Sequence, residues 1–170
     1  MAFDTYMNVG GGTVVVGEAT ASSIPTGAFE IFSFSWGASN PTTVGTTGSG
    51  LSAGKVSVSS FNVMKKSEKS SPILFSSCCN GQHYSDATVV MRKAAGTSGK
   101  QSTFITYVFT DVMVESIQWS GSSGGDDTPT ESVSFAFAKC SITYNTQNTK
   151  DGTTGTGASA TWDLTAAQSM

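Results

Sequence analysis

The sequence predicts a mainly β fold: a small β-barrel of two packed antiparallel sheets with one short flanking α-helix. Two observations support this fold. Apolar and polar residues alternate with a period of two in segments spread along the chain, which is typical of half-buried strands. Helix start and stop signals come together convincingly in only one place, between residues 70 and 94. We expect the 170 residues to form a single domain, 1–170.

The alternation defines roughly eight strands, close to the usual number for a sandwich or a barrel. In chain order, the expected strands are 3–9, a weaker candidate at 13–18, then 28–36, 55–64, 87–93, 102–110, 112–119 and 132–144. In the last of them, Val133, Phe135 and Phe137 point to one face. Within 55–64 the alternation slips phase, which predicts a β-bulge near Ser59.

The helix is expected at about 71–81. Ser71 is a candidate N-cap, because its hydroxyl can accept a hydrogen bond from an unpaired amide of the first turn. Pro72 then occupies the first helical position, where its missing N–H has no cost. Gly81 can adopt the left-handed conformation that ends a helix.

Two of the expected strands are apolar on both faces. In 28–36, Phe29 and Ile31 lie on one face, whereas Phe32, Phe34 and Trp36 lie on the other. The strand at 102–110 repeats this pattern. A single-layer barrel buries one face of each strand, so the second face must lie under the helix or against another chain. This pattern predicts an oligomer.

Two long loops are rich in Gly, Thr and Ser and have no hydrophobic anchors: an extended loop at 37–54 and a C-terminal segment at 145–160. Loops of this length inside a domain are usually functional or flexible, and this composition is typical of segments that become ordered on a partner. We expect both loops to belong to the same domain rather than to link two domains.

Composition excludes several classes of partner. Only 12% of the residues are charged and the net charge is −3, which argues against nucleic-acid binding. No apolar stretch is long enough for a membrane span, and the N-terminus lacks the features of a cleavable signal. The three cysteines are expected to be free thiols of a protein made in the cytosol, because Cys78 and Cys79 are sequence neighbours that cannot form a normal disulfide.

Catalytic chemistry has one candidate base, His83, which is the only histidine. Ser85 and Asp86 are close to it in sequence, but the members of a catalytic triad meet through the fold and no nucleophile-elbow pattern is present. We therefore expect no enzyme and interpret His83 as a polar residue where the chain leaves the helix.

Metal and cofactor sites are not expected either. Cys79, His83 and Cys140 could share a metal ion, but paired Cys-x-x-Cys spacing is absent and a glycine interrupts the helix between the first two. Asp126 and Asp127 lack the further ligands of a calcium loop and are interpreted as a solvated turn. The glycine run at 10–12 lacks the Lys-Ser/Thr of a phosphate-binding loop and is interpreted as a turn.

A family resemblance emerges from several segments taken in order. They are FEIFSFSWGASNP at 29–41, the Gly-rich stretch that follows, KVSVSSFNVMKKSEKSSPILFSSCCNGQH at 55–83, FITYVFTDVMVESIQWSGSS at 104–123, TPTESVSFAFAKCSITYNTQN at 128–148, and a late Trp162-Asp163. Each segment is short, but the ordered set is specific. The chain resembles the Hcp family, the tube-forming proteins of bacterial type VI secretion systems.

The resemblance implies a small barrel related to contractile tail-tube proteins, which assembles into hexameric rings that stack into a hollow tube. A contractile sheath would surround the tube, a spike protein would tip it, and effector proteins would travel in its lumen. The protein would be made in the bacterial cytoplasm without a signal peptide and exported to the extracellular space or a target cell. The family is not known as an enzyme.

The family's extended loop corresponds to 37–54 and should touch a neighbouring subunit or ring. The residues expected at such an interface are Trp36, Gly37, Asn40, Pro41, Val44, Gly50, Leu51 and Glu131.

Two other functions fit the sequence. The tail-tube protein of a phage or another contractile injection particle would use the same architecture. A secreted carbohydrate-binding β-sandwich would instead use Trp36, Trp119 and Trp162 as stacking residues, although aromatic residues at alternating strand positions are more often core or interface.

Overall fold

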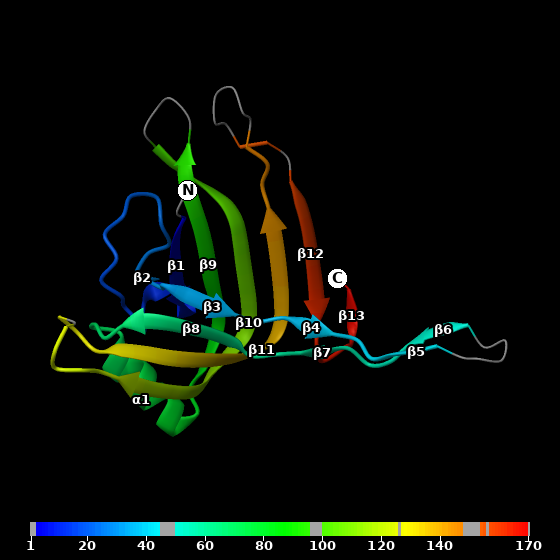
Figure 1. The fold of residues 1–170 in the computed structure, drawn as a ribbon, viewed down its shortest axis with the longest axis horizontal. Helices are drawn as coiled ribbons and strands as arrows, with labels where there is room; N and C mark the ends of the chain where they lie inside the picture. Colours follow the sequence, from blue (N-terminus) through cyan, green and yellow to red (C-terminus); the bar gives the residue numbers. More distant parts are fainter. Residues whose placement is uncertain are drawn as a thin grey trace.

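Two antiparallel sheets curl against each other and share two long, bent strands, with a single helix beside them (Figure 1). The computed structural model describes residues 3–44, 50–95, 100–125, 127–147, 154–155 and 157–169. The predicted mainly β fold is confirmed. In the described ranges, no helix is long and apolar enough to cross a membrane.

The larger sheet has the strand order β13-β12-β11-β10-β9-β1-β2. The second sheet branches from it where β8 pairs with the far half of β11, and β3 pairs with β8. The strand bounds are β1 Asp4–Val9, β2 Phe29–Glu30, β3 Ser33–Ser35, β8 Phe61–Lys66, β9 His83–Ala95, β10 Lys100–Ser120, β11 Thr130–Tyr144, β12 Ala158–Asp163 and β13 Gln168–Ser169. β12 and β8 both pair with β11, but with different halves of it. The two halves of β11 thus belong to two sheets that face each other across the core.

The predicted strand 28–36 is wrong as one element, because the chain crosses here from one sheet to the other. β2 pairs with β1, whereas β3 pairs with β8. At the crossing, the Ile31 amide donates to Thr5 on one sheet (3.0 Å) and the Phe32 amide donates to Met64 on the other (2.8 Å). Ile31 is buried and Phe32 is exposed. This crossing explains why the segment is apolar on both faces.

The predicted strands 102–110 and 112–119 are one continuous strand, β10. Asp111 separates them with a φ of 54°, and Glu115 falls at a register shift against β11. Asp tolerates the left-handed conformation better than most residues. The interruption in the sequence pattern therefore marks a bend in one strand rather than a turn between two.

The phase slip at Ser59 separates two strands, β7 (Ser57–Val58) and β8. Ser59 exchanges hydrogen bonds with Gly37: its amide donates to the Gly37 carbonyl and its hydroxyl accepts from the Gly37 amide, both at 2.9 Å. The expected bulge is therefore a break in strand pairing. The weak strand at 13–18 is absent; there, Val15 forms an isolated bridge with Val9.

The helix α1 (Ser71–Asn80) begins one residue earlier than the predicted cap requires. Ser70 occupies the N-cap position without a side-chain capping bond, so Ser71 as N-cap is wrong. Pro72 lies in the first turn as the second helical residue rather than the first, whereas Gly81 ends the helix with φ 68° and ψ 35°, as predicted. Leu74 of the helix is fully buried.

The core between the sheets is largely aromatic. Phe61, Phe109 and Phe135 are buried, and Trp36 packs edge-on against Phe109 (5.2 Å between ring centroids) and Tyr107 (5.3 Å). Edge-to-face pairs at these separations are favourable beyond simple burial. This cluster joins β3 and β8 to the larger sheet.

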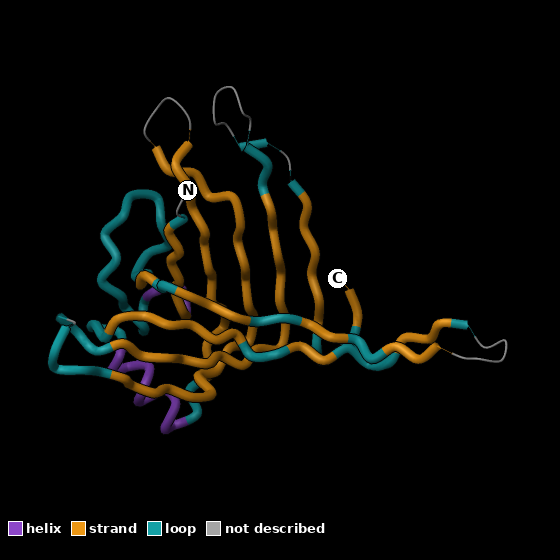
Figure 2. Tube along the Cα trace, in the orientation of Figure 1, coloured by secondary structure: helices purple, strands orange, loops and turns teal. Residues whose placement is uncertain are grey.

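The predicted loop 37–54 is a β-ribbon, apart from residues 45–49, which lie outside the described residues. β4 (Ala38–Ser39) pairs with β7, and β5 (Thr42–Val44) pairs with β6 (Leu51–Ala53). The ribbon projects from one end of the molecule (Figures 1 and 2). We call residues 38–44 and 50–53 the hairpin.

The C-terminal segment 145–160 is also more regular than expected where it is described. Gln147 forms a bridge with Thr154, and β12 begins at Ala158. In the turn after β12, Asp163 accepts hydrogen bonds from the Thr165 hydroxyl (2.5 Å) and the Ala166 amide (3.0 Å). These bonds, with a further one from Lys139, hold the pKa of Asp163 far below its ordinary value.

Candidate functional site

One face of the larger sheet runs without a break from the buried core to open surface. Direct cross-strand partners in an antiparallel sheet point to the same side. Phe109 pairs with Cys140 and both are buried, whereas Ile105 pairs with Tyr144 at the other end of the same face. Figure 2 shows that β3 and β8 cross only the lower part of this sheet.

Beyond this cover, the face is apolar and partly exposed. Tyr144 is 43% exposed, Ile142 is 38% exposed, and alanines of β12 lie beside both. The Phe104 ring lies between Phe3 (6.1 Å) and Tyr144 (6.5 Å) and extends the patch to the N-terminal strand. We call this surface the open face; its residues are Phe3, Phe104, Ile105, Ile142, Tyr144, Ala158 and Ala160.

The hairpin carries a second exposed apolar surface. Val44 and Leu51 are cross-strand partners, and each is 73% exposed. At its base, the Gly54 amide donates to the Pro41 carbonyl (2.7 Å), and a side chain at Gly54 would lie 2.8 Å from that oxygen. The base is therefore fixed, while the apolar pair faces solvent.

The predicted interface residues fall into three groups. Gly37, Asn40, Pro41, Val44, Gly50 and Leu51 are exposed on or beside the hairpin. Trp36 is half-buried against the aromatic core of its own chain. Glu131 is only 1% exposed and has almost no surface to offer a partner. The structure thus brings most of these residues together on the hairpin and places Glu131 elsewhere.

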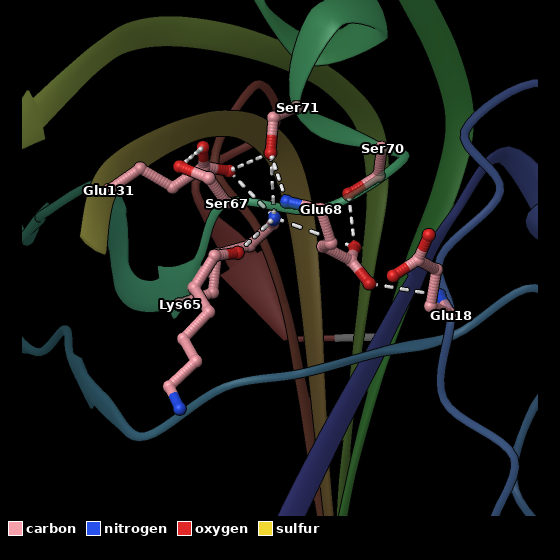
Figure 3. Close-up of polar contacts among 8 residues, drawn as sticks. Glu18, Lys65, Ser67, Glu68, Ser70, Ser71 and Glu131 are labelled. Carbon is pink, nitrogen blue, oxygen red and sulfur yellow. Dashed lines mark hydrogen bonds and ion pairs between the residues drawn. The ribbon is translucent and has the colours of Figure 1, made fainter. Parts of the chain in front are cut away.

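Glu131 belongs to a buried ion-pair network, shown in Figure 3, that the sequence analysis missed. Its carboxylate lies 2.6 Å from the Lys65 ammonium, and neither side chain is accessible to solvent. Glu68 provides a second carboxylate 3.5 Å from the same ammonium. Lys65 and Glu131 are cross-strand partners on β8 and β11, so the pair lies between the two strands.

Hydroxyl groups complete the network. Glu131 accepts hydrogen bonds from Ser71 (2.9 Å) and Ser67 (3.2 Å), which explains why the Ser71 hydroxyl is not available as a helix cap. The other carboxylate oxygen of Glu68 accepts from the Glu18 amide (2.9 Å). A buried ion pair is tolerated only when such bonds satisfy its remaining donors and acceptors. The network links β8, β11, the helix start and the loop before β2.

The candidate catalytic residues lie on β9, which begins at His83, shortly after the helix ends at Asn80. His83, Ser85 and Asp86 are all in β9, where alternation places Asp86 on the opposite face from the other two. The Ser85 hydroxyl donates to Asp86 (2.6 Å). This arrangement lacks the serine-to-histidine contact that nucleophile activation requires.

The candidate metal ligands are not brought together. Cys79 is exposed on the helix, whereas Cys140 is buried in the core, where burial raises the pKa of its thiol. Across the described part of the chain, no group of three or more His, Cys, Asp or Glu could hold a metal ion. Asp127 is exposed, and Asp126 lies outside the described residues. All three cysteines are free, as predicted.

The described residues form a bent two-sheet barrel that leaves part of one sheet face uncovered and projects an apolar ribbon. Exposed apolar surfaces of this kind are typical of proteins that associate with other chains.

Comparison with known proteins gives the family. The family described as "Type VI secretion system effector, Hcp" matches residues 6–144. Protein hcp1 of Pseudomonas aeruginosa is 32% identical over 110 residues, which span 65% of this chain and 66% of that protein. The chain therefore belongs to the Hcp family of type VI secretion.

Solved structures agree. A type six secretion system protein superposes with a TM-score of 0.89 at 31% identity, over 99% of this chain and 100% of that one. Hcp1 from Salmonella typhimurium superposes with a TM-score of 0.79 at 27% identity, over the full length of both. The resemblance inferred from the sequence is confirmed, and the phage and carbohydrate-binding alternatives are not favoured.

Proposed function

We propose that this protein is the structural subunit of the hollow inner tube of a type VI secretion system, in which six copies close a ring and rings stack. The observation that carries the proposal is the open face, an apolar sheet surface that continues the core and that no part of the described chain covers. Exposed apolar surfaces of this kind on a monomer mark interaction sites.

The proposed ring of six needs a head-to-tail contact between identical copies, because a two-fold contact stops at a dimer, whereas a head-to-tail contact forms a ring when its rotation closes. The open face supplies the apolar half of this contact, and the hairpin reaches away from the barrel toward a neighbour. A closed ring also protects the outer strands, such as β13, whose free edges would otherwise invite unspecific pairing.

The role is structural rather than enzymatic, and it needs no cofactor. The proposed partners are further copies of the chain, a spike protein at the tip, a contractile sheath around the tube and effector proteins in the lumen. The protein is made in the bacterial cytoplasm and leaves by type VI secretion, into the extracellular space or a target cell.

The first experiment combines negative-stain electron microscopy with mass photometry over a concentration series. Six-fold rings or stacked tubes are expected. A monomer at every concentration, particularly one retained on polysaccharide, would overturn the proposal and favour a binding module.

A pair of variants tests the role of the open face. Tyr144→Asp places a charge in the patch and should abolish rings. Ser159→Asp places the same charge on the opposite face of β12, because Ser159 is the neighbour of Ala160, the partner of Ile142; this variant should leave rings intact. Rings in both variants, or in neither, would contradict the assignment of this face.

A further inference from the structure

A groove lies at the end of the barrel opposite the hairpin. Its volume of about 520 Å³ is within the range of small-molecule sites. Three segments that are distant in sequence form most of it: the loop before β2, the crossing between β2 and β3, and the turn after β8. In Figure 1 these segments lie at the left end of the molecule. The proposed tube function does not use this groove.

Aromatic and small apolar side chains provide one part of the lining. Phe32 is 53% exposed, and Tyr6, Ala19 and Ala21 also line the groove. A cation of the chain itself already uses this surface, because the Lys66 ammonium lies over the Phe32 ring, 5.9 Å from its centroid. Contacts between an ammonium group and an aromatic face are favourable at such distances. The groove therefore offers a surface on which an alkyl-ammonium group can pack.

The charged residues of the lining make the groove negative. Glu18, Glu30 and Glu68 line it together with a single lysine, Lys66. Glu18 and Glu30 are exposed, and neither carboxylate takes part in an ion pair within the described ranges. Two carboxylates of the groove thus have no positive partner in their own chain.

The charges close to Tyr6 agree with this balance. Burial raises the pKa of the Tyr6 hydroxyl most, Asp4 and Glu30 raise it further, and Arg92 lowers it. Asp4 and Arg92 are cross-strand partners of opposite charge, so they largely offset each other. The carboxylate of Glu30 remains.

The buried ion-pair network that adjoins the groove also has too little positive charge. Its one ammonium, Lys65, is shared by two carboxylates, Glu131 at 2.6 Å and Glu68 at 3.5 Å. Lys65 and Glu131 are inaccessible, whereas the Glu68 side chain is 14% exposed and lines the groove. Figure 3 shows Glu68 between this network and Glu18, whose amide it binds. A largely buried carboxylate that is only partly compensated favours a cation on its open side.

The net charge and the spacing of the carboxylates define the ligand. Groove and network together contain two lysines and four glutamates, a net charge of −2. Yet no group of three or more His, Cys, Asp or Glu among the described residues is arranged to hold a metal ion. The charges therefore suit an extended cation better than a compact one.

We propose that the groove binds a linear aliphatic diamine, in which an alkyl chain joins two ammonium groups. One ammonium lies by Glu68 and Glu18, the other by Glu30 on β2, and the chain packs on Phe32. Glu68 is already held by Lys65, so this wall needs no ordering when the ligand binds. The site is complete within one copy, and the inference is therefore independent of the proposed tube function.

Saturation-transfer-difference NMR at low salt tests the site, with 1,5-diaminopentane as the probe. The method observes the ligand and serves for single copies and for assembled protein alike. Pentylamine is the matched ligand, because it has the same chain with one charge, and it should bind about fivefold more weakly. Mg²⁺ has two charges without a chain, so at equal concentration it should displace little of the diamine.

Protein variants locate the binding. Glu30→Gln should reduce diamine binding to the level of pentylamine, whereas Glu115→Gln, at an exposed glutamate outside the groove, should leave it unchanged. Lys66→Met should strengthen binding, because it frees the Phe32 ring and removes the competing ammonium. A misfolded variant could not produce such a gain.

Three results would overturn the proposal. The first is equal binding of pentylamine and the diamine, or displacement of the diamine by an equal concentration of Mg²⁺. The second is unchanged binding in both Glu30→Gln and Lys66→Met. The third is tighter binding of a short capped peptide with two lysines than of the diamine, which would assign the groove to a basic protein segment instead.

Discussion

Replacing Glu131 by Gln should destabilise the fold far more than its single charge would suggest. The variant keeps the shape of the side chain but removes the carboxylate 2.6 Å from the fully buried Lys65 ammonium. Removing one partner of a buried pair typically costs about 3–5 kcal/mol, because the other charge is left without compensation. Glu68 remains 3.5 Å away and offsets part of this cost. We therefore expect a loss near the lower limit, about 3 kcal/mol.

The assay is urea unfolding at neutral pH, at a protein concentration where mass photometry finds monomer only, because assembly would add its own stabilisation. With an m-value of about 2 kcal/mol/M, the expected loss lowers the urea midpoint by about 1.5 M. The matched control is the double variant Lys65→Met/Glu131→Leu, which removes both charges and keeps similar volumes. It should differ from the wild type by no more than about 1–2 kcal/mol.

Two outcomes would refute this reasoning. A loss below about 1 kcal/mol for Glu131→Gln would be the behaviour of a solvent-exposed pair and would contradict the burial of Lys65. A Lys65→Met/Glu131→Leu variant as unstable as the sum of the single variants Lys65→Met and Glu131→Leu would mean that the two charges do not depend on each other.

Three further outcomes follow from single sites. Because the pKa of Asp163 is lowered in the fold, its carboxylate stabilises the folded state above its ordinary pKa of 3.8, and this contribution is lost as the pH falls below that value. In acid unfolding curves, the stability difference between wild type and Asp163→Asn should therefore shrink. Gly12→Ala should lower the melting temperature much more than Gly11→Ala. Both glycines have a positive φ, which costs about 1–2 kcal/mol for alanine. Only at Gly12 would the new Cβ also lie 1.8 Å from a backbone oxygen. Tyr84→Phe should lower the free energy of unfolding in urea by about 1 kcal/mol, because it removes the buried 2.5 Å hydrogen bond between the Tyr84 and Ser77 hydroxyls. The loss stays small because Ser77 keeps its bond to a helix carbonyl. No measurable change would show that the contact is absent in solution.

Local structure could be predicted from the sequence, whereas strand pairing could not. The helix and its end at Gly81 were predictable because caps and stops act within one turn. The alternation also located the cores of the long strands. It could not reveal that the chain changes sheets between Ile31 and Phe32, because a strand that leaves one sheet for another keeps its period of two. Strand pairing depends on contacts between residues distant in sequence.

The ion-pair network was missed although a signal for it was present. Lys65 follows Phe61 and Val63 on the apolar face of its strand, and Glu131 precedes Val133 and Phe135 on the apolar face of another. Two opposite charges, each at an inward position of an alternating strand, indicate a buried pair. The hairpin was predicted as an irregular loop because glycine, threonine and serine hide its alternation.

The position of β8 connects the stability of the barrel to the placement of the hairpin. The hairpin leads into β8 through β7, and the turn with Glu68 follows directly after β8. A slip of β8 by one residue against β11 would turn the side chains of β8 to the other face and displace the hairpin relative to the barrel. Such a slip would also bury the Lys66 charge and separate Lys65 from Glu131. Since a buried ion pair adds little net stability over an apolar pair, we infer that its main effect here is to fix this register, and with it the position of the hairpin.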